Sequence, residues 1–120
     1  MSYVDGFVIP IPKKKMKAYE KMAKAASKVW MEHGALDYKE CVADDLEVKC
    51  GLSFKQLLKL KPGETVVFAW ITYKSRKHRD QVNAKVMKDP RINEMMKEGE
   101  PMPFDDKRMS YGGFAAFVEV

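Results

Sequence analysis

The run from Thr65 to Tyr73 constrains the fold of this chain more than any other stretch. It reads Thr-Val-Val-Phe-Ala-Trp-Ile-Thr-Tyr, so both sides of an extended strand would carry apolar side chains. A strand that is apolar on both sides belongs in the middle of a sheet that is covered on both faces. We therefore expect residues 65–73 to form a central strand with two buried faces.

The segments around this strand alternate between strand and helix patterns. Apolar residues at steps of three and four make residues 13–33 an amphipathic helix. Strands are predicted at 3–11, 38–43, 65–73 and 111–120, and helices at 13–33, 75–88 and 91–97, with a possible short helix at 53–60. This β-α-β-β-α-β order is the ferredoxin-like pattern, an α+β fold with a four-stranded antiparallel sheet and two main helices on one face.

A single copy of this fold leaves one face of its sheet bare. The strands at 3–11, 65–73 and 111–120 carry apolar side chains on both faces, which exceeds the few hundred Å² of contiguous apolar surface that soluble monomers usually expose. Two such sheets pairing face to face would form a dimeric α/β barrel, and two-fold dimers are the commonest oligomers. We expect a homodimer. The alternative is that residues 45–63 fold over the bare face of their own sheet.

Size and composition predict one globular domain spanning residues 1–120, with 46% hydrophobic and 32% charged residues. No apolar run approaches the roughly 18 residues of a membrane span, and the first residues lack the basic n-region of a secretory signal. A cytoplasmic location without membrane association is expected. The net charge of +5 admits anionic partners, but acids interrupt the lysines of helix 13–33, so nucleic acid is not an expected partner.

Cysteines and acidic clusters give no sign of a metal or a cofactor, and none is predicted. Cys41 and Cys50 form no paired motif and are expected to be buried thiols of a reduced protein. Asp44, Asp45 and Glu47 match no calcium-binding loop.

The most polar segment begins at Pro101, where two prolines precede four consecutive charged residues. Arg108 suits a planar carboxylate or phosphate because its guanidinium donates two parallel hydrogen bonds. Asp105, Lys107 and Arg108 are therefore candidates for binding a polar or anionic ligand at the open end of a barrel. The alternative is a structural clasp, in which Asp105 satisfies backbone donors of the loop and Lys107 or Arg108 ties the loop to the domain or to a partner chain.

Two carboxylates fall on strand positions with apolar neighbours, Asp5 and Glu40. Burial would raise their pKa values and suit a general base. The alternative is that each pairs with an internal arginine or lysine, or points to solvent at an edge. Arg79 and Asn83 lie four residues apart on the inward stripe of the second helix, where they either line a pocket or hold the Met102–Met109 segment.

Taken together, these motifs resemble the YbaA-like family of small bacterial proteins of unknown function. The resemblance covers nearly the whole chain and is weakest at residues 46–63. It implies a dimeric α/β barrel and assigns no catalytic residue. It rests on Tyr3–Pro10, Trp30–Leu36, Glu40–Asp45, Phe68–Ser75, Arg79–Asp80, Asn83–Met87, Asp89–Arg91, Met102–Met109 and Tyr111–Phe114.

Trp70 and His78 also resemble residues of haem-degrading proteins in the same barrel superfamily, which use an asparagine, a tryptophan and a histidine in broadly this layout. Here the first strand offers Asp5 in place of the asparagine. The simpler interpretation places Trp70 in the core and leaves His78 as a solvated residue in the first turn of its helix.

Two functional hypotheses follow. In the first, a homodimer binds a small polar or anionic molecule in a barrel pocket, with Asp5, Trp70, Asn83, Asp105 and Arg108 nearby. A cofactor-free, monooxygenase-like oxidation is a variant of this hypothesis by superfamily analogy alone. In the second, the protein is a non-catalytic dimeric accessory whose polar loop builds the interface. No motif names a substrate or a reaction.

Overall fold

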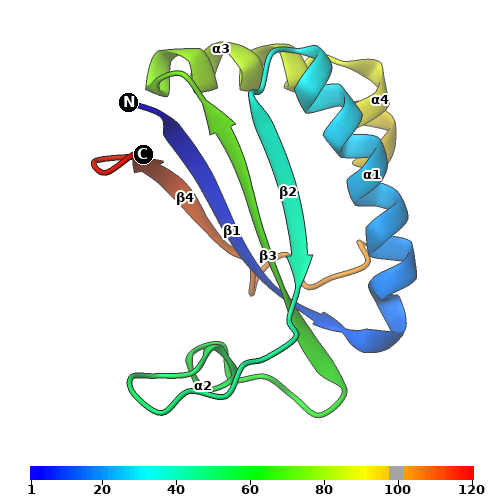
Figure 1. Cartoon of the computed structure of the whole chain (residues 1–120). Helices are drawn as coiled ribbons and strands as arrows, with labels where there is room; N and C mark the ends of the chain where they lie inside the picture. The colour runs from blue at the N-terminus through cyan, green and yellow to red at the C-terminus, as the bar shows by residue number, and fades with distance from the viewer. Residues whose placement is uncertain (98–101) are drawn as a thin grey trace.

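The structure is a computed structural model that describes residues 1–97 and 102–120, so Pro101 lies outside the described residues. The strands are β1 (Tyr3–Pro12), β2 (Asp37–Val42), β3 (Glu64–Tyr73) and β4 (Ser110–Ala115), and the helices are α1 (Met16–Glu32), α2 (Phe54–Leu57), α3 (Arg76–Met87) and α4 (Pro90–Met95), with a 3₁₀ turn at Lys13–Lys15. The strands form one antiparallel sheet in the order β2-β3-β1-β4 (Figure 1). This is the predicted ferredoxin-like α+β arrangement, with the run at 65–73 in the interior of the sheet.

The ends of the helices follow from capping residues that the sequence supplies. Gly34 adopts a φ of +114° directly after α1, a backbone conformation that side chains disfavour. The Ser75 hydroxyl accepts a hydrogen bond from the His78 N–H and caps α3. Asp89 caps α4 in the same way, with Pro90 as its first residue.

The core lies between one face of the sheet and the helices. One buried cluster joins Val29 of α1 and Val82 of α3 to Ile71 of β3. A second joins Ala23 of α1 to Ile9 of β1, nearer the lower end of the sheet as drawn in Figure 1. The helices therefore cover the face that carries the odd-numbered residues of β1 and β3.

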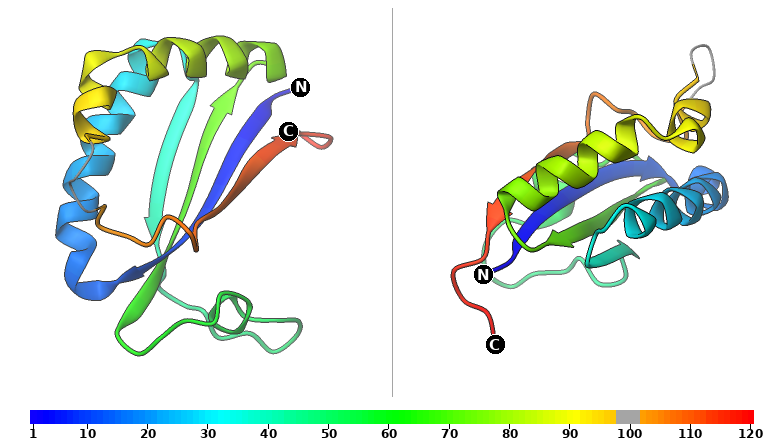
Figure 2. Two further views of the ribbon diagram at one scale, coloured as in Figure 1. Left: turned by 180° about the vertical axis from the view of Figure 1, so that it is seen from behind. Right: turned by 90° about the horizontal axis from the view of Figure 1, so that it is seen from above.

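None of α1, α3 and α4 lies on the other face of the sheet, and we call it the open face (Figures 1 and 2). Phe68 of β3 and Phe114 of β4 point to it and expose 45% and 64% of their surface. The segment between β2 and β3 covers only one end of this face, where Val66 is 3% exposed beside Leu46 and Phe54. This arm, residues 43–63, projects beyond the end of the sheet on the side away from α1 (Figures 1 and 2). It touches the sheet at one end, where Phe54 packs against Phe68 with ring centroids 6.4 Å apart.

Two details differ from the sequence-based expectations. β4 ends at Ala115 and not at Val120, because Ala115 pairs with Tyr3, the first residue of its only neighbouring strand. The Ala116 N–H still donates to the Ser2 carbonyl, and the strand then has no further partner. The prediction that both cysteines are buried is wrong, since Cys41 and Cys50 are exposed free thiols.

Candidate functional site

The open face contains a hollow of about 640 Å³ whose lining is mainly apolar. Its floor includes Gly6 of β1 and Gly112 of β4, which lie opposite each other in the strand register. Neither glycine adds a side chain, so the Phe114 ring rests over the floor, 3.6 Å from where a Cβ of Gly6 would stand. Missing side chains beside exposed rings produce a concave apolar surface, the usual form of a small-molecule site.

Trp70 lies in this hollow, on the opposite side of β3 from the core, and is half-buried. Its ring packs edge-on against Phe68 with centroids 5.7 Å apart, and its Nε1–H donates to Asp37 Oδ2 at 3.3 Å. Lys39 Nζ lies 6.0 Å from the Trp70 ring and 2.9 Å from Asp37 Oδ1. The Lys39 hydrogen bond holds the pKa of Asp37 below its usual value. The hollow is thus aromatic, with one charged pair beside it.

Asp5, Arg79 and Asn83 come together on the other, helix-covered face. Asp5 is only 6% exposed, and Arg79 Nη1 donates to its Oδ1 at 2.7 Å. Burial raises the pKa of Asp5, although the Arg79 charge and a hydrogen bond from Asn83 act to lower it. The Arg79 guanidinium also lies over the Tyr3 ring, 5.0 Å from its centroid. Asp5 is therefore paired with an internal arginine, as the structural alternative for this carboxylate required.

Two residues of this polar cluster were not among the predicted site residues. Trp30 Nε1–H and the Tyr73 hydroxyl both donate to Asn83 Oδ1, at 3.1 and 3.3 Å. The strand alternation could have identified Tyr73, since it shares a face with Asp5, and the helical stripe includes Trp30. Their meeting at Asn83 could not be predicted from the sequence, because it depends on how α1 and α3 cross the sheet.

Arg108 joins its own loop to the base of the arm. Its Nη1 donates to Glu64 Oε2 at 2.6 Å, and its Nη2 donates to the carbonyls of Leu58 and Lys59 at 3.3 Å. The hydrogen bond from Arg108 holds the pKa of Glu64 below its usual value. These are the contacts of a structural clasp, and they occupy the guanidinium edges that a ligand would use.

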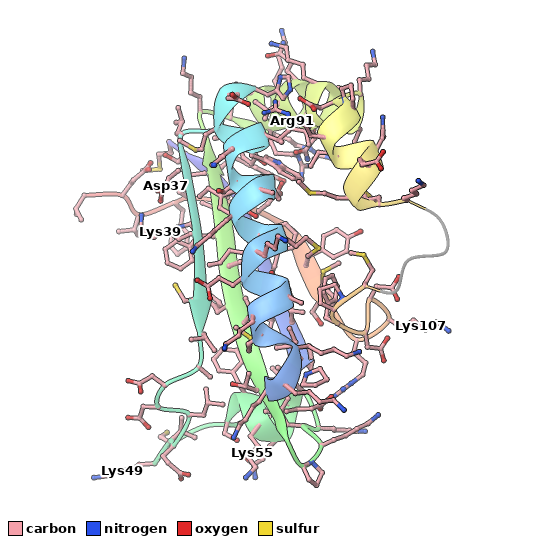
Figure 3. All side chains as sticks on the ribbon, turned by 90° about the vertical axis from the view of Figure 1, so that its right-hand side faces the viewer. Asp37, Lys39, Lys49, Lys55, Arg91 and Lys107 are labelled. Atoms are coloured by element: carbon pink, nitrogen blue, oxygen red, sulfur yellow. The ribbon has the colours of Figure 1, made fainter. Side chains whose placement is uncertain are left out.

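The two other charged candidates of that loop make no contact with the hollow. Asp105 Oδ1 accepts the Lys107 N–H at 3.0 Å, and its carbonyl accepts the Arg108 N–H, so it closes a turn of the loop. Lys107 is exposed, and its side chain points away from the sheet (Figure 3).

The seven predicted ligand-binding residues therefore occupy three places in one chain. Trp70 lies on the open face, the Asp5 cluster lies under the helices, and Asp105, Lys107 and Arg108 lie in the clasp loop. His78 is likewise remote from Trp70, because it packs against Tyr73 on the helix-covered side with ring centroids 5.9 Å apart. His78 is half-buried, and its Nδ1 accepts the Lys74 N–H at 2.9 Å, so it is not simply solvated.

Comparison with known proteins assigns the chain to a family. The family described as "Protein of unknown function (DUF1428)" matches residues 2–106. The chain belongs to this family. It is 45% identical over 119 residues to the protein described as "Uncharacterized protein YbaA" in Escherichia coli K12 and in Shigella flexneri, and the match covers 99% of each chain.

The fold of this DUF1428 member is shared by a solved structure of a dimeric ferredoxin-like protein from an uncultured marine organism. The two chains superpose with a TM-score of 0.57 over the full length of both, at 14% identity. At that identity the similarity concerns the fold alone, and it supports the ferredoxin-like assignment.

Neither a metal-binding cluster nor a membrane-spanning helix is found in the part of the chain that the structure describes. Within residues 1–97 and 102–120, no three histidine, cysteine, aspartate or glutamate side chains gather to hold a metal ion. None of the described helices is long and apolar enough to cross a membrane. The hollow on the open face combines a volume of about 640 Å³ with a mainly apolar lining.

Proposed function

We propose that two copies of this chain pair through their open faces and enclose a chamber that binds a small, flat, mainly apolar molecule carrying one polar or anionic group. The observation that carries this proposal is the exposed hollow on the open face, where the rings of Phe68, Trp70 and Phe114 stand around Gly6 and Gly112. Apolar surface of this kind is stabilised by removal from water at about 25 cal/mol per Å². The ferredoxin-like neighbour is itself described as dimeric, which supports a second copy as the occupant.

The chemistry of the lining indicates the class of ligand. Aromatic rings offer stacking surfaces for a flat molecule, and the hydroxyls of Thr72, Ser110 and Tyr111 supply hydrogen-bonding groups in the lining, whereas Trp70 Nε1–H already donates to Asp37. Lys39 beside the Trp70 ring supplies one positive charge for a polar or anionic group. No reaction is proposed for this chamber.

The pairing surface is tested by placing a charge on it. Phe114→Lys buries a lysine in the proposed interface and is expected to convert the dimer to a monomer in sedimentation velocity at 10–50 μM protein. Phe117→Lys is the matched control, because Phe117 is 87% exposed and follows the end of β4. Equal masses for the two variants would show that the open face is not the interface.

Ligand binding is tested with 1-anilinonaphthalene-8-sulfonate, which is flat, apolar and anionic. We expect saturable binding that quenches Trp70 fluorescence in the wild type, with at least fivefold weaker binding to the Phe114→Lys monomer. Trp70→Phe separates this signal from that of Trp30. Weak binding that does not saturate and leaves Trp70 unquenched would contradict the chamber.

A dimer without a ligand is the second candidate function, and the Arg108 contacts favour it. The guanidinium of Arg108 and the carboxylate of Asp105 are satisfied by the protein itself. This candidate shares the paired open faces and predicts a packed interface, so it gives a dimer that fails to bind the naphthalene probe.

A further inference from the structure

A second groove lies between α1 and β2, on the helix-covered side and away from the open face. Its volume is about 450 Å³, and Met16, Ala23, Val42 and Val67 give it apolar walls. Its polar centre is Glu40, which the strand alternation directs toward α1. Nothing in the proposed dimer or its chamber uses this groove.

Glu40 is held by two tyrosine hydroxyls. The Tyr38 hydroxyl donates to Oε2 at 2.7 Å, and the Tyr19 hydroxyl donates to Oε1. Burial, together with the neighbouring Glu40, raises the pKa of both tyrosines well above the usual value, so both remain neutral donors. They fix the carboxylate in place without neutralising its charge.

The charge of Glu40 has no basic partner among residues 1–97 and 102–120. The ion pairs in that part of the chain involve other carboxylates, and the nearby Lys24 of the groove pairs with Glu20 of its own helix at 3.1 Å. A half-buried carboxylate with only neutral partners attracts a cation strongly, because its surroundings screen the charge less than bulk water does. The groove is therefore suited to bind a positively charged group.

The walls of the groove indicate which kind of cation fits. One carboxylate with two neutral phenols supplies fewer oxygen ligands than the six to eight that calcium takes. Tyrosine faces attract ammonium groups, and the apolar walls accommodate a hydrocarbon body. We infer that this groove binds a primary amine with an aromatic or aliphatic body, its ammonium group paired with Glu40 between Tyr19 and Tyr38.

The inference is tested with phenethylamine and with 3-phenylpropionate, which has a similar body and the opposite charge. Binding is followed by ¹H–¹⁵N chemical shifts of the wild-type protein at pH 7. We expect saturable shifts for the amine at Tyr19, Tyr38 and Val42, and at least tenfold weaker binding of the carboxylate. Shifts that map elsewhere, equal binding of the two probes, or no binding of the amine would overturn the assignment, whether or not any variant folds.

Two variants test whether the carboxylate of Glu40 binds the amine. Glu40→Gln keeps an acceptor oxygen for one hydroxyl, offers an amide N–H to the oxygen of the other, and removes the negative charge, so it is expected to weaken phenethylamine binding at least tenfold. Glu47→Gln removes an exposed carboxylate that does not line the groove and is expected to change the affinity less than twofold. Equal losses in the two variants would show that general electrostatic attraction, and not Glu40, binds the amine.

Discussion

Gly113 shows how one missing side chain permits the packing of two others. A Cβ at this position would lie 2.2 Å from the Tyr3 hydroxyl and 2.8 Å from its ring, whereas a Cβ on Gly112 would meet nothing closer than 3.9 Å. The strand register is regular at both glycines. Gly113 gives the Tyr3 ring its place beside Arg79.

Gly113→Ala is therefore expected to lower the free energy of unfolding by about 1–2 kcal/mol, the usual cost of overpacking. The added methyl forces the Tyr3 ring away from the Arg79 guanidinium. Urea denaturation at fixed protein concentration measures the change, with Gly112→Ala as the control, expected within about 0.5 kcal/mol of wild type. Equal effects of the two substitutions would show that the Tyr3 contact is unimportant.

Arg79→Met leaves Asp5 buried without its cation, and the cost is expected to be about 3 kcal/mol at pH 7.5. Burial already raises the pKa of Asp5, and loss of Arg79 raises it further, so the folded state holds the proton more tightly than the unfolded chain. The contribution of this group to stability then falls as the pH rises through the folded pKa. Urea denaturation should therefore show a smaller cost at pH 5 than at pH 7.5.

The double variant Asp5→Asn with Arg79→Met is the control for that prediction. It has no carboxylate to titrate at this position, so its stability relative to wild type should not improve on acidification in the same way. If the cost of Arg79→Met alone were identical at pH 5 and pH 7.5, the account of Asp5 as a carboxylate dependent on Arg79 would be wrong.

The sequence predicted the strands and helices more completely than the contacts of the candidate site residues. Periodicity and caps located every strand and main helix, because those signals are local and repeat along the chain. The clasp was anticipated as one interpretation of Arg108, but its partner was not. Glu64 lies at the start of β3, and its approach to Arg108 depends on the path of the loop after α4, which has no periodic signal.

Arg108→Ala is expected to lower the free energy of unfolding by about 1–2 kcal/mol at pH 7, as loss of a charge-assisted hydrogen bond does. Arg108 holds the pKa of Glu64 below its usual value. The pair therefore stabilises the protein at pH values above the usual pKa of a glutamate, and this stabilisation is lost as the pH falls through the folded pKa of Glu64. Urea denaturation should show the difference from wild type shrinking as the pH falls below about 4.

Lys107→Ala is the matched control for the clasp, since the neighbouring Lys107 is exposed and makes no ion pair within the described part of the chain. Its stability should stay within about 0.5 kcal/mol of wild type at both pH values. If Lys107→Ala lowered the free energy of unfolding as much as Arg108→Ala, the positive charge of the loop would stabilise the protein and the Arg108–Glu64 contact would not.

The whole molecule is a two-layer structure in which one face of the sheet stays open. Its extents are 41 × 38 × 20 Å, and the shortest dimension corresponds to a sheet with a single layer of helices. Its radius of gyration is 15.3 Å, against about 14 Å for a compact domain of this length. The arm and the uncovered open face account for the excess. The sequence signalled this shape through strands that are apolar on both faces.

The pairing of open faces is tested most directly by the mass of the wild-type protein in solution. Size-exclusion chromatography with multi-angle light scattering at micromolar concentration is the measurement. If the open faces pair, the mass is twice the 13.8 kDa of one chain and independent of dilution across the micromolar range. A mass of one chain throughout that range would contradict this pairing.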